Sequence, residues 1–301
     1  MYLEHFGLTQ LPFNLTPDTE FFCDLPTHRE ALNVLLIALE SGEGFIKITG
    51  PVGSGKTMLC RKLLNELPAP FVTAYIPNPD MNANALLQSI ADEFGLEYSR
   101  HSGHNHILAK INEYLLLTAE QGNKVVLIID EAQAIPLKTL ESLRLLTNLE
   151  TEKQKLLQIV LFAQPELDEI LQKKAIRQLR QRISFSYHLQ PLTKRQVREY
   201  LLHRLYIAGN THTDLLKPLA VNALQFYTQG IPRLINILAN KSFMAAYGKG
   251  QSTISMRHVH LAAMDTEATR RRLNLWLSTR ILPWLLPVAA LSVYFLSRLS
   301  L

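Results

Sequence analysis

Residues 50–57 read Gly-Pro-Val-Gly-Ser-Gly-Lys-Thr and match the pattern GxxxxGK[ST] at all of its fixed positions. An apolar run, Phe45–Thr49, precedes this stretch, and a helical pattern over Lys56–Leu67 follows it. The glycines permit a tight turn whose backbone N–H groups face phosphate oxygens, and the helix adds its positive end. The alternative is a plain glycine turn before a helix. The flanking strand and helix favour a phosphate-binding loop in an α/β domain.

The residue types in this loop indicate how a nucleotide is held. Lys56 is expected to reach the β- and γ-phosphates, and the hydroxyl of Thr57 is expected to bind Mg²⁺. Backbone groups of the loop and of the first helical turn supply the other contacts. The predicted nucleotide-binding residues are Gly50, Pro51, Val52, Gly53, Ser54, Gly55, Lys56, Thr57 and Met58.

A second motif follows the continuous apolar run Val125–Ile129, which is typical of a strand buried on both faces. Asp130 and Glu131 end this run, and the end of a parallel strand is the ligand-binding edge of a sheet. Asp130 is expected to hold Mg²⁺, and Glu131 to orient and deprotonate the attacking water. Alone, such an acid pair could be an ordinary loop start. Together with the glycine loop, it predicts nucleotide hydrolysis.

Several other polar residues are candidates for the same chemistry. Gln164 ends the next apolar run and could sense the γ-phosphate, or it could be a loop amide. Arg180 or Arg182, in a basic segment with Arg177, could act on a neighbouring subunit, or the segment could be a solvated helix face. Arg233 follows Gly-Ile-Pro and could touch phosphate from a lid, or it could be a surface arginine.

The order of elements predicts the fold. Apolar runs alternate with helical patterns up to Pro191, which indicates a parallel sheet flanked by helices. Only helical patterns follow. We expect an α/β P-loop domain (1–190), an α-helical lid (191–265), a basic linker (266–280) and a transmembrane helix (281–297). The expected strands are Phe45–Thr49, Phe71–Ile76, Val125–Ile129, Leu157–Ala163 and Ile183–Leu189, and the expected helices are 28–41, 56–67, 84–94, 106–120, 138–149, 193–208, 215–227, 232–247 and 256–264.

Composition limits the class of protein. The 301 residues are 47% hydrophobic and 19% charged, which excludes a disordered chain. The net charge of +5 permits contact with nucleic acid or an anionic membrane and requires neither. Two cysteines without ligand spacing favour a reducing compartment. Three histidines (His101, His104 and His106) could bind a metal, although a polar surface loop explains them better.

The C-terminal stretch Ile281–Leu296 is uncharged and lies between Arg280 and Arg298. Its 16 residues make about 24 Å of helix, which the flanking arginines can extend by reaching toward the headgroups. The arginines before it predict that this side is cytoplasmic, and the N-terminus shows no signal peptide. We expect a single-pass inner-membrane protein with a cytoplasmic nucleotide-binding domain. The alternative is a helix that lies on the membrane or on a partner.

Six stretches carry a resemblance to the AAA+ ATPases of the general secretion pathway A type: MYLEHFGLTQLPFNLTPDTEFF, GPVGSGKT, VVLIIDEAQ, FAQPEL, LRQRI and GIPR. The resemblance covers about residues 1–265. It implies a P-loop domain with a helical lid, and ATP with Mg²⁺ as the ligands. It also implies sensing by Gln164 and Arg233 and a finger role for Arg180 or Arg182.

The resemblance implies a homo-oligomer that hydrolyses ATP. Such a protein would assist assembly of a type IV-like pilus, of the mannose-sensitive haemagglutinin kind, or of a secretion complex at the inner membrane. One alternative is a DNA-binding switch like the transposition helper ATPases, which the basic charge favours and the apolar tail does not. Another is a scaffold that hydrolyses poorly, which Glu131 argues against.

Overall fold

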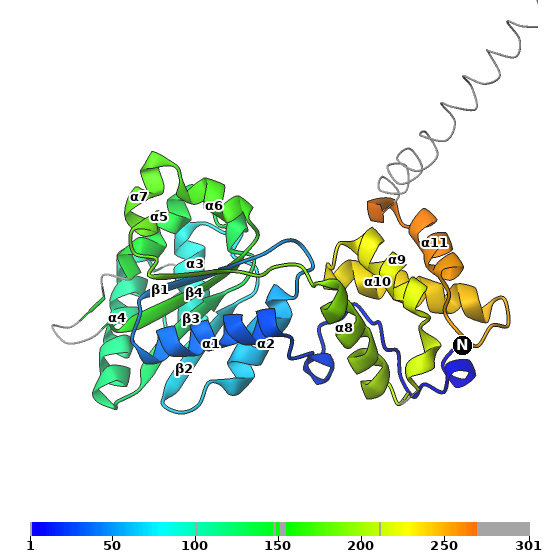
Figure 1. The fold of residues 1–301 in the computed structure, drawn as a ribbon. Helices are drawn as coiled ribbons and strands as arrows, with labels where there is room; N and C mark the ends of the chain where they lie inside the picture. Colours follow the sequence, from blue (N-terminus) through cyan, green and yellow to red (C-terminus); the bar gives the residue numbers. More distant parts are fainter. Residues whose placement is uncertain (1, 100–101, 147–148, 151–154, 211, 270–301) are drawn as a thin grey trace, which may run out of the picture. The chain divides into compact units, whose positions relative to one another are not determined.

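The computed structural model describes residues 2–99, 102–146, 149–150, 155–210 and 212–269. The chain divides into two compact units. One unit, the sheet unit, runs from Pro17 to Pro191. The other, the helical unit, joins the first sixteen residues to the segment that starts at Leu192. The ribbon in Figure 1 follows the chain through both units, which are described separately below.

The sheet unit alternates strands with helices, as the order of apolar runs predicts. Its strands are β1 (Phe45–Thr49), β2 (Phe71–Ile76), β3 (Lys124–Ile129), β4 (Leu157–Ala163) and β5 (Phe185–His188). Its α-helices are α1 (Pro26–Glu40), α2 (Lys56–Glu66), α3 (Ala83–Glu93), α4 (His104–Glu120), α5 (Leu137–Leu146), α6 (Glu166–Leu171) and α7 (Arg177–Arg180). Short 3-10 turns add η2 (Thr19–Phe21), η3 (Ala132–Ala134) and η4 (Lys174–Ile176).

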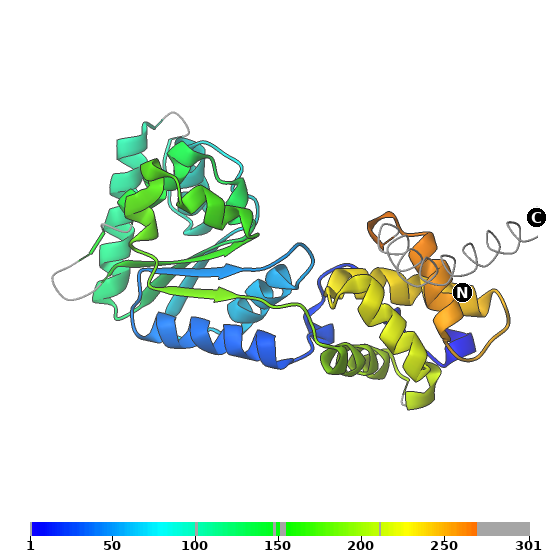
Figure 2. The same ribbon diagram turned by 45° about the horizontal axis from the view of Figure 1, so that its top comes forward.

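The five strands are all parallel, in the order β2-β3-β4-β1-β5. Successive side chains of a strand point to opposite faces. In β3, Leu127 joins the core beneath α3 to α7, whereas Val126 and Ile128 join the core beneath α1 and α2. The sheet therefore lies between two helical layers (Figures 1 and 2). Because β1, β3 and β4 are central and covered on both sides, their sequences are largely apolar.

The helical unit contains no strand among its described residues. Figure 2 shows its helices in yellow-green to orange. Its elements are η1 (Glu4–Phe6), α8 (Lys194–Ile207), η5 (Thr213–Leu215), α9 (Pro218–Thr228), α10 (Pro232–Tyr247) and α11 (Met256–Met264). A capping box starts α8, since the Thr193 hydroxyl accepts from Gln196 N–H and the Gln196 side chain accepts from Thr193 N–H.

The N-terminal lead differs from its expected place. We expected residues 1–16 in the nucleotide-binding domain, but they pack with the helical unit. The rings of Tyr2, Phe6 and Phe13 gather around Phe243 of α10, and the Tyr2 hydroxyl donates to Asn240 Oδ1 at 2.6 Å. The aromatic lead fills a core that α8 to α11 leave open. Chain order alone cannot reveal such a long-range contact.

The first helix also begins differently. We expected it to start at residue 28, but α1 begins at Pro26, and its cap residue, Leu25, makes no side-chain hydrogen bond. Proline suits the first helical position because it lacks the N–H that would be unsatisfied there and its φ is already helical. The helix α9 likewise begins at Pro218 instead of Leu215. The expected starts of these two helices were wrong, because a proline at the first helical position begins each of them.

The expected linker and membrane helix lie largely beyond the described residues, which end at 269. Within the described part of the chain, no helix is long and apolar enough to cross a membrane.

Candidate functional site

The glycine loop joins the end of β1 to the start of α2. Gly53 and Gly55 adopt left-handed backbone, with φ of 79° and 98°. A side chain at Gly55 would also collide, because its Cβ would lie 2.9 Å from Nε2 of His28. His28 lies on α1, and its Nε2 is 3.0 Å from the carbonyl oxygen of Ser54. The sequence pattern predicts the loop, whereas this contact from α1 was missed because no local motif marks it.

Lys56 begins α2 and is 5% exposed. Its ammonium group donates to the carbonyl oxygens of Gly50 and Pro51 at 2.8 and 3.1 Å. Burial lowers the pKa of Lys56, and the carboxylates of Glu131 and Asp130 oppose this effect. The ammonium is therefore held inside the curve of the loop, close to both acids.

Thr57 and Asp130 meet across the gap between α2 and the end of β3. The hydroxyl of Thr57 donates to Asp130 Oδ2 at 2.7 Å, and Asp130 is 2% exposed. Burial raises the pKa of Asp130, while the hydrogen bonds from Thr57 and from the Glu131 N–H lower it. The two side chains that the motifs assign to Mg²⁺ thus form one hydrogen-bonded pair, in which Asp130 is buried and Thr57 is half-buried.

Glu131 follows Asp130 in a left-handed conformation, with φ of 51°. A residue with a side chain rarely adopts this region, and it persists where neighbours enforce it. The Glu131 N–H donates to Asp130 Oδ1 at 2.9 Å. Its Oε2 accepts from Gln164 Nε2 at 2.9 Å. Gln164 follows β4, so the two expected catalytic residues lie together where neighbouring strands end.

The residues at this edge fit a nucleotide and Mg²⁺. The hydroxyl of Ser54 is buried and has no hydrogen-bond partner among the described residues, as expected for a group that bonds to a phosphate oxygen. A Cβ at Gly50 would approach the Ser54 hydroxyl to 2.8 Å, so glycine keeps the loop tight. A hydroxyl and a carboxylate are oxygen ligands of the kind Mg²⁺ prefers, and Mg²⁺ often takes only one or two from a protein. Lys56 would hold phosphate, and Thr57 with Asp130 would hold Mg²⁺.

The expected arginines lie on other elements. Arg180 ends α7 and is exposed, and Arg182 follows it and is half-buried. An arginine that acts on a neighbouring subunit must be exposed in the single chain, and Arg180 meets this condition. Arg233 is the second residue of α10, behind Pro232, and is exposed on the helical unit.

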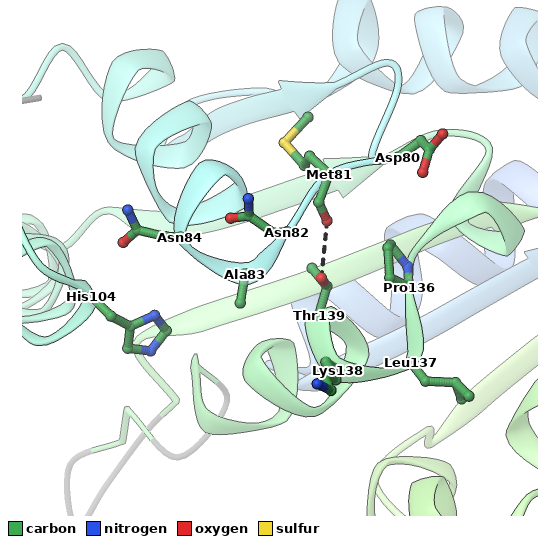
Figure 3. Close-up of a pocket in the computed structure, with 10 residues that line it drawn as sticks. All are labelled: Asp80, Met81, Asn82, Ala83, Asn84, His104, Pro136, Leu137, Lys138 and Thr139. Atoms are coloured by element: carbon green, nitrogen blue, oxygen red, sulfur yellow. Dashed lines mark hydrogen bonds between the residues drawn. The ribbon is translucent and has the colours of Figure 1, made fainter.

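A cavity of about 710 Å³ opens beside the carboxyl edge of the sheet, where α3, α4 and α5 begin (Figure 3). The Thr139 hydroxyl donates to the Met81 carbonyl at 2.9 Å and joins two of its walls. His104 starts α4 and lines this cavity, so it does not lie in the expected polar loop. His101 lies outside the described residues. Among the residues that the structure describes, no cluster of three or more histidine, cysteine, aspartate or glutamate side chains could hold a metal ion.

Comparisons with known proteins agree with this geometry. A family model described as an AAA domain matches residues 39–171. General secretion pathway protein A of Aeromonas hydrophila is 40% identical over 270 residues, which is 90% of this chain and 49% of that protein. This chain therefore spans about half the length of the curated relative.

Solved structures show the same fold. Cdc6p of Pyrobaculum aerophilum has a TM-score of 0.65 at 20% identity, over 84% of this chain and 70% of that one. ORC2 of Aeropyrum pernix has a TM-score of 0.62 at 18% identity, over 84% and 72%. The RuvB Holliday junction branch migration motor of Thermotoga maritima has 0.54 at 17% identity, over 84% and 72%.

The parallel sheet and the site at its carboxyl edge define a P-loop protein of the AAA+ class. Within that class, the chain is similar to the general secretion pathway A type over 90% of its length. The expected resemblance and the α/β P-loop fold are thereby confirmed.

Proposed function

We propose that this protein hydrolyses ATP to ADP and phosphate. The observation that carries the proposal is the cluster of Lys56, the Thr57–Asp130 pair and the Glu131–Gln164 pair at one edge of the sheet. These groups supply a phosphate-binding cation, oxygen ligands and a base, which are the parts that phosphoryl transfer to water requires.

Each side chain has a role that follows from its position. Lys56 binds the β- and γ-phosphates, and the loop N–H groups fix their orientation. Glu131 holds the attacking water and takes its proton, while Gln164 senses the γ-phosphate. Mg²⁺, when bound by Thr57 and Asp130, supplies positive charge that stabilises the charge developing on the phosphates. The bond from the γ-phosphorus to the bridging oxygen breaks, and ADP leaves with that oxygen.

We further propose that the protein works as a homo-oligomer. Arg180 or Arg182 would reach the nucleotide of a neighbouring subunit, and Arg233 would contact phosphate from the helical unit. The exposure of Arg180 and Arg233 supports these roles. In the cell, the oligomer would assist assembly of a type IV-like pilus, of the mannose-sensitive haemagglutinin kind, or of a secretion complex. The similarity to general secretion pathway protein A of Aeromonas hydrophila supports such a pathway.

We propose that the stretch 281–297 anchors the chain in the inner membrane, with the nucleotide-binding domain in the cytoplasm. Its apolar sequence and the arginines before it support this topology. The secretion-pathway relative is consistent with work at a membrane.

Phosphate release tests the central proposal. Purified full-length protein with Mg-ATP should release phosphate, Lys56→Ala should lose nucleotide binding and release, and Glu131→Gln should bind nucleotide without release. Lys62→Ala on the same helix and Glu120→Gln at the end of α4 are matched surface controls that should retain turnover. Wild-type turnover equal to that of both site variants would contradict hydrolysis.

The same variants test the pathway. A strain that lacks this protein should lose surface pili or secreted substrate, and the wild-type gene should restore them. Lys56→Ala and Glu131→Gln should not. Restoration by both variants would contradict a role for hydrolysis in assembly.

A further inference from the structure

Gln133 lies in the turn η3, two residues after the proposed base. Its Nε2 donates to Glu131 Oε2, and its Oε1 accepts from the backbone N–H of Gln164 at 2.9 Å. Gln164 Nε2 donates to the same Glu131 oxygen at 2.9 Å. Three hydrogen bonds thus close a ring that joins the end of β3 to the end of β4.

The ring fixes which way the Gln133 amide points. A backbone N–H can only donate, so the group of Gln133 that faces Gln164 N–H must be the carbonyl oxygen. The Nε2 group is then directed at Glu131. Both amides hold Oε2 of Glu131, and Oε1 has no hydrogen-bond partner among the described residues. One carboxylate oxygen is therefore anchored and the other is left for water.

The backbone around Gln133 is held as firmly as its side chain. The N–H of Ala134 donates to the carbonyl oxygen of Glu131 at 2.8 Å and closes the turn. Ala132 is fully buried in the core beneath α3 to α7, which orients the turn relative to the sheet. The left-handed Glu131 directs the chain into this turn, so Gln133 is brought back over the carboxylate that precedes it.

We propose that Gln133 is a positioning residue for ATP hydrolysis: it holds the Glu131 carboxylate in the orientation that attack by water requires, and it links this carboxylate to Gln164. This inference rests on the proposed hydrolysis. Because the hydrogen bonds of Gln133 within the described chain go to Glu131 and Gln164, and not to the glycine loop or the Thr57–Asp130 pair, it affects turnover without changing nucleotide affinity. A general base contributes roughly 10²- to 10⁴-fold to rate, and loss of its orientation removes part of that factor.

The test compares kcat with nucleotide affinity. Gln133→Met keeps the side-chain length and removes both hydrogen bonds, and it should lower kcat on the order of tenfold with KM and the ATP dissociation constant unchanged. Gln133→Glu places a second carboxylate beside Glu131 and should lower kcat further. Gln133→Asn keeps the amide on a shorter stem and should fall between Gln133→Met and the wild type.

Gln121→Met is the matched control, because Gln121 precedes β3 at the opposite edge of the sheet and is exposed. It should leave kcat unchanged. If wild-type turnover is real but Gln133→Met and Gln133→Glu both stay within about twofold of it, the positioning role is wrong. A rise in KM and in the ATP dissociation constant that accounts for the loss would also overturn it. An inactive wild type would instead contradict the proposed hydrolysis.

Discussion

The Asp130 carboxylate is nearly inaccessible to solvent, and burial raises its pKa above the ordinary value for aspartate. Ionisation of this group is thus harder in the folded chain than in the unfolded chain. The protonated Asp130 therefore adds to the free energy of unfolding at pH values below the ordinary carboxyl pKa. This contribution is lost as the pH rises through the raised pKa of Asp130. At neutral pH the negative charge on Asp130 therefore lowers the stability of the free protein, and the proposed Mg²⁺ binding is the chemistry that requires this charge.

We expect Asp130→Asn to raise the melting temperature of the metal-free and nucleotide-free protein at pH 7. An asparagine can accept from the Glu131 N–H and donate to Thr57, so the neutral group loses little. The difference from wild type should shrink as the pH falls into the carboxyl range, where Asp130 is neutral as well. Thermal unfolding from pH 7 to pH 4 in a chelating buffer measures this, and phosphate release should be lost in the same variant.

Asp80→Asn supplies the comparison, because Asp80 is exposed. It should change the melting temperature little at either pH. A lower melting temperature for Asp130→Asn at pH 7 would show that the charge stabilises the free protein.

Lys56, Thr57, Asp130 and Glu131 lie close together because strand ends and a helix start of one parallel sheet must meet at its carboxyl edge. The hydrogen bond of Gln164 to Glu131 follows from the same rule. Gln133 could not be inferred in this way. Its contact depends on the left-handed φ of Glu131, which the surrounding fold enforces and no local propensity favours.

Among the elements, the turn between α9 and α10 leaves no room for a side chain at Gly230. Gly230 has φ of 76°, and its N–H is 3.3 Å from the Thr228 hydroxyl. Leu192 N–H donates to the Gly230 carbonyl at 2.9 Å. A Cβ at Gly230 would lie 2.0 Å from the Leu192 carbonyl oxygen, so backbone would have to move.

We expect Gly230→Ala to lower the free energy of unfolding of the helical unit by more than about 2 kcal/mol. The loss of stability has two causes: alanine disfavours the left-handed backbone of position 230, and its Cβ would collide with the backbone of Leu192. Gly248→Ala tests the opposite case, because Gly248 has ordinary backbone and its Cβ would meet nothing nearer than 3.5 Å. Chemical denaturation should separate the two variants, and equal stability would contradict this account of the turn.

Strand boundaries could be predicted better than helix starts. The expected bounds of β1, β2 and β4 agree with the structure, because a largely apolar run marks each of these strands from end to end. The edge strand β5 is shorter than its apolar pattern predicted, since Ile183 and Leu189 lie just outside it. The packing of the lead on α10 depends on residues more than two hundred positions apart, which local patterns do not encode.

For the whole molecule, the proposed anchor, residues 281–297, attaches the chain to the membrane, and the nucleotide site lies in a separate part of the chain. The full chain should remain in the membrane fraction after washing with high salt and with carbonate. A variant that ends at residue 280 should move to the soluble fraction and keep nucleotide binding, because the described units precede that residue. Release of the full chain by salt, or retention of the shortened chain, would contradict a spanning helix.

The helical unit is built from two separate stretches of chain, and this constrains the order in which it can form. During synthesis, Tyr2, Phe6 and Phe13 are made before the sheet unit, but Phe243 is made only after the complete sheet unit. The helical unit cannot complete its core until both of its stretches are present. The sheet unit can therefore fold early, while the aromatic lead stays exposed until α10 emerges. The lead is thus translated before the sheet unit and buried after it, and a nascent chain halted before α10 would expose it to chaperones or proteases.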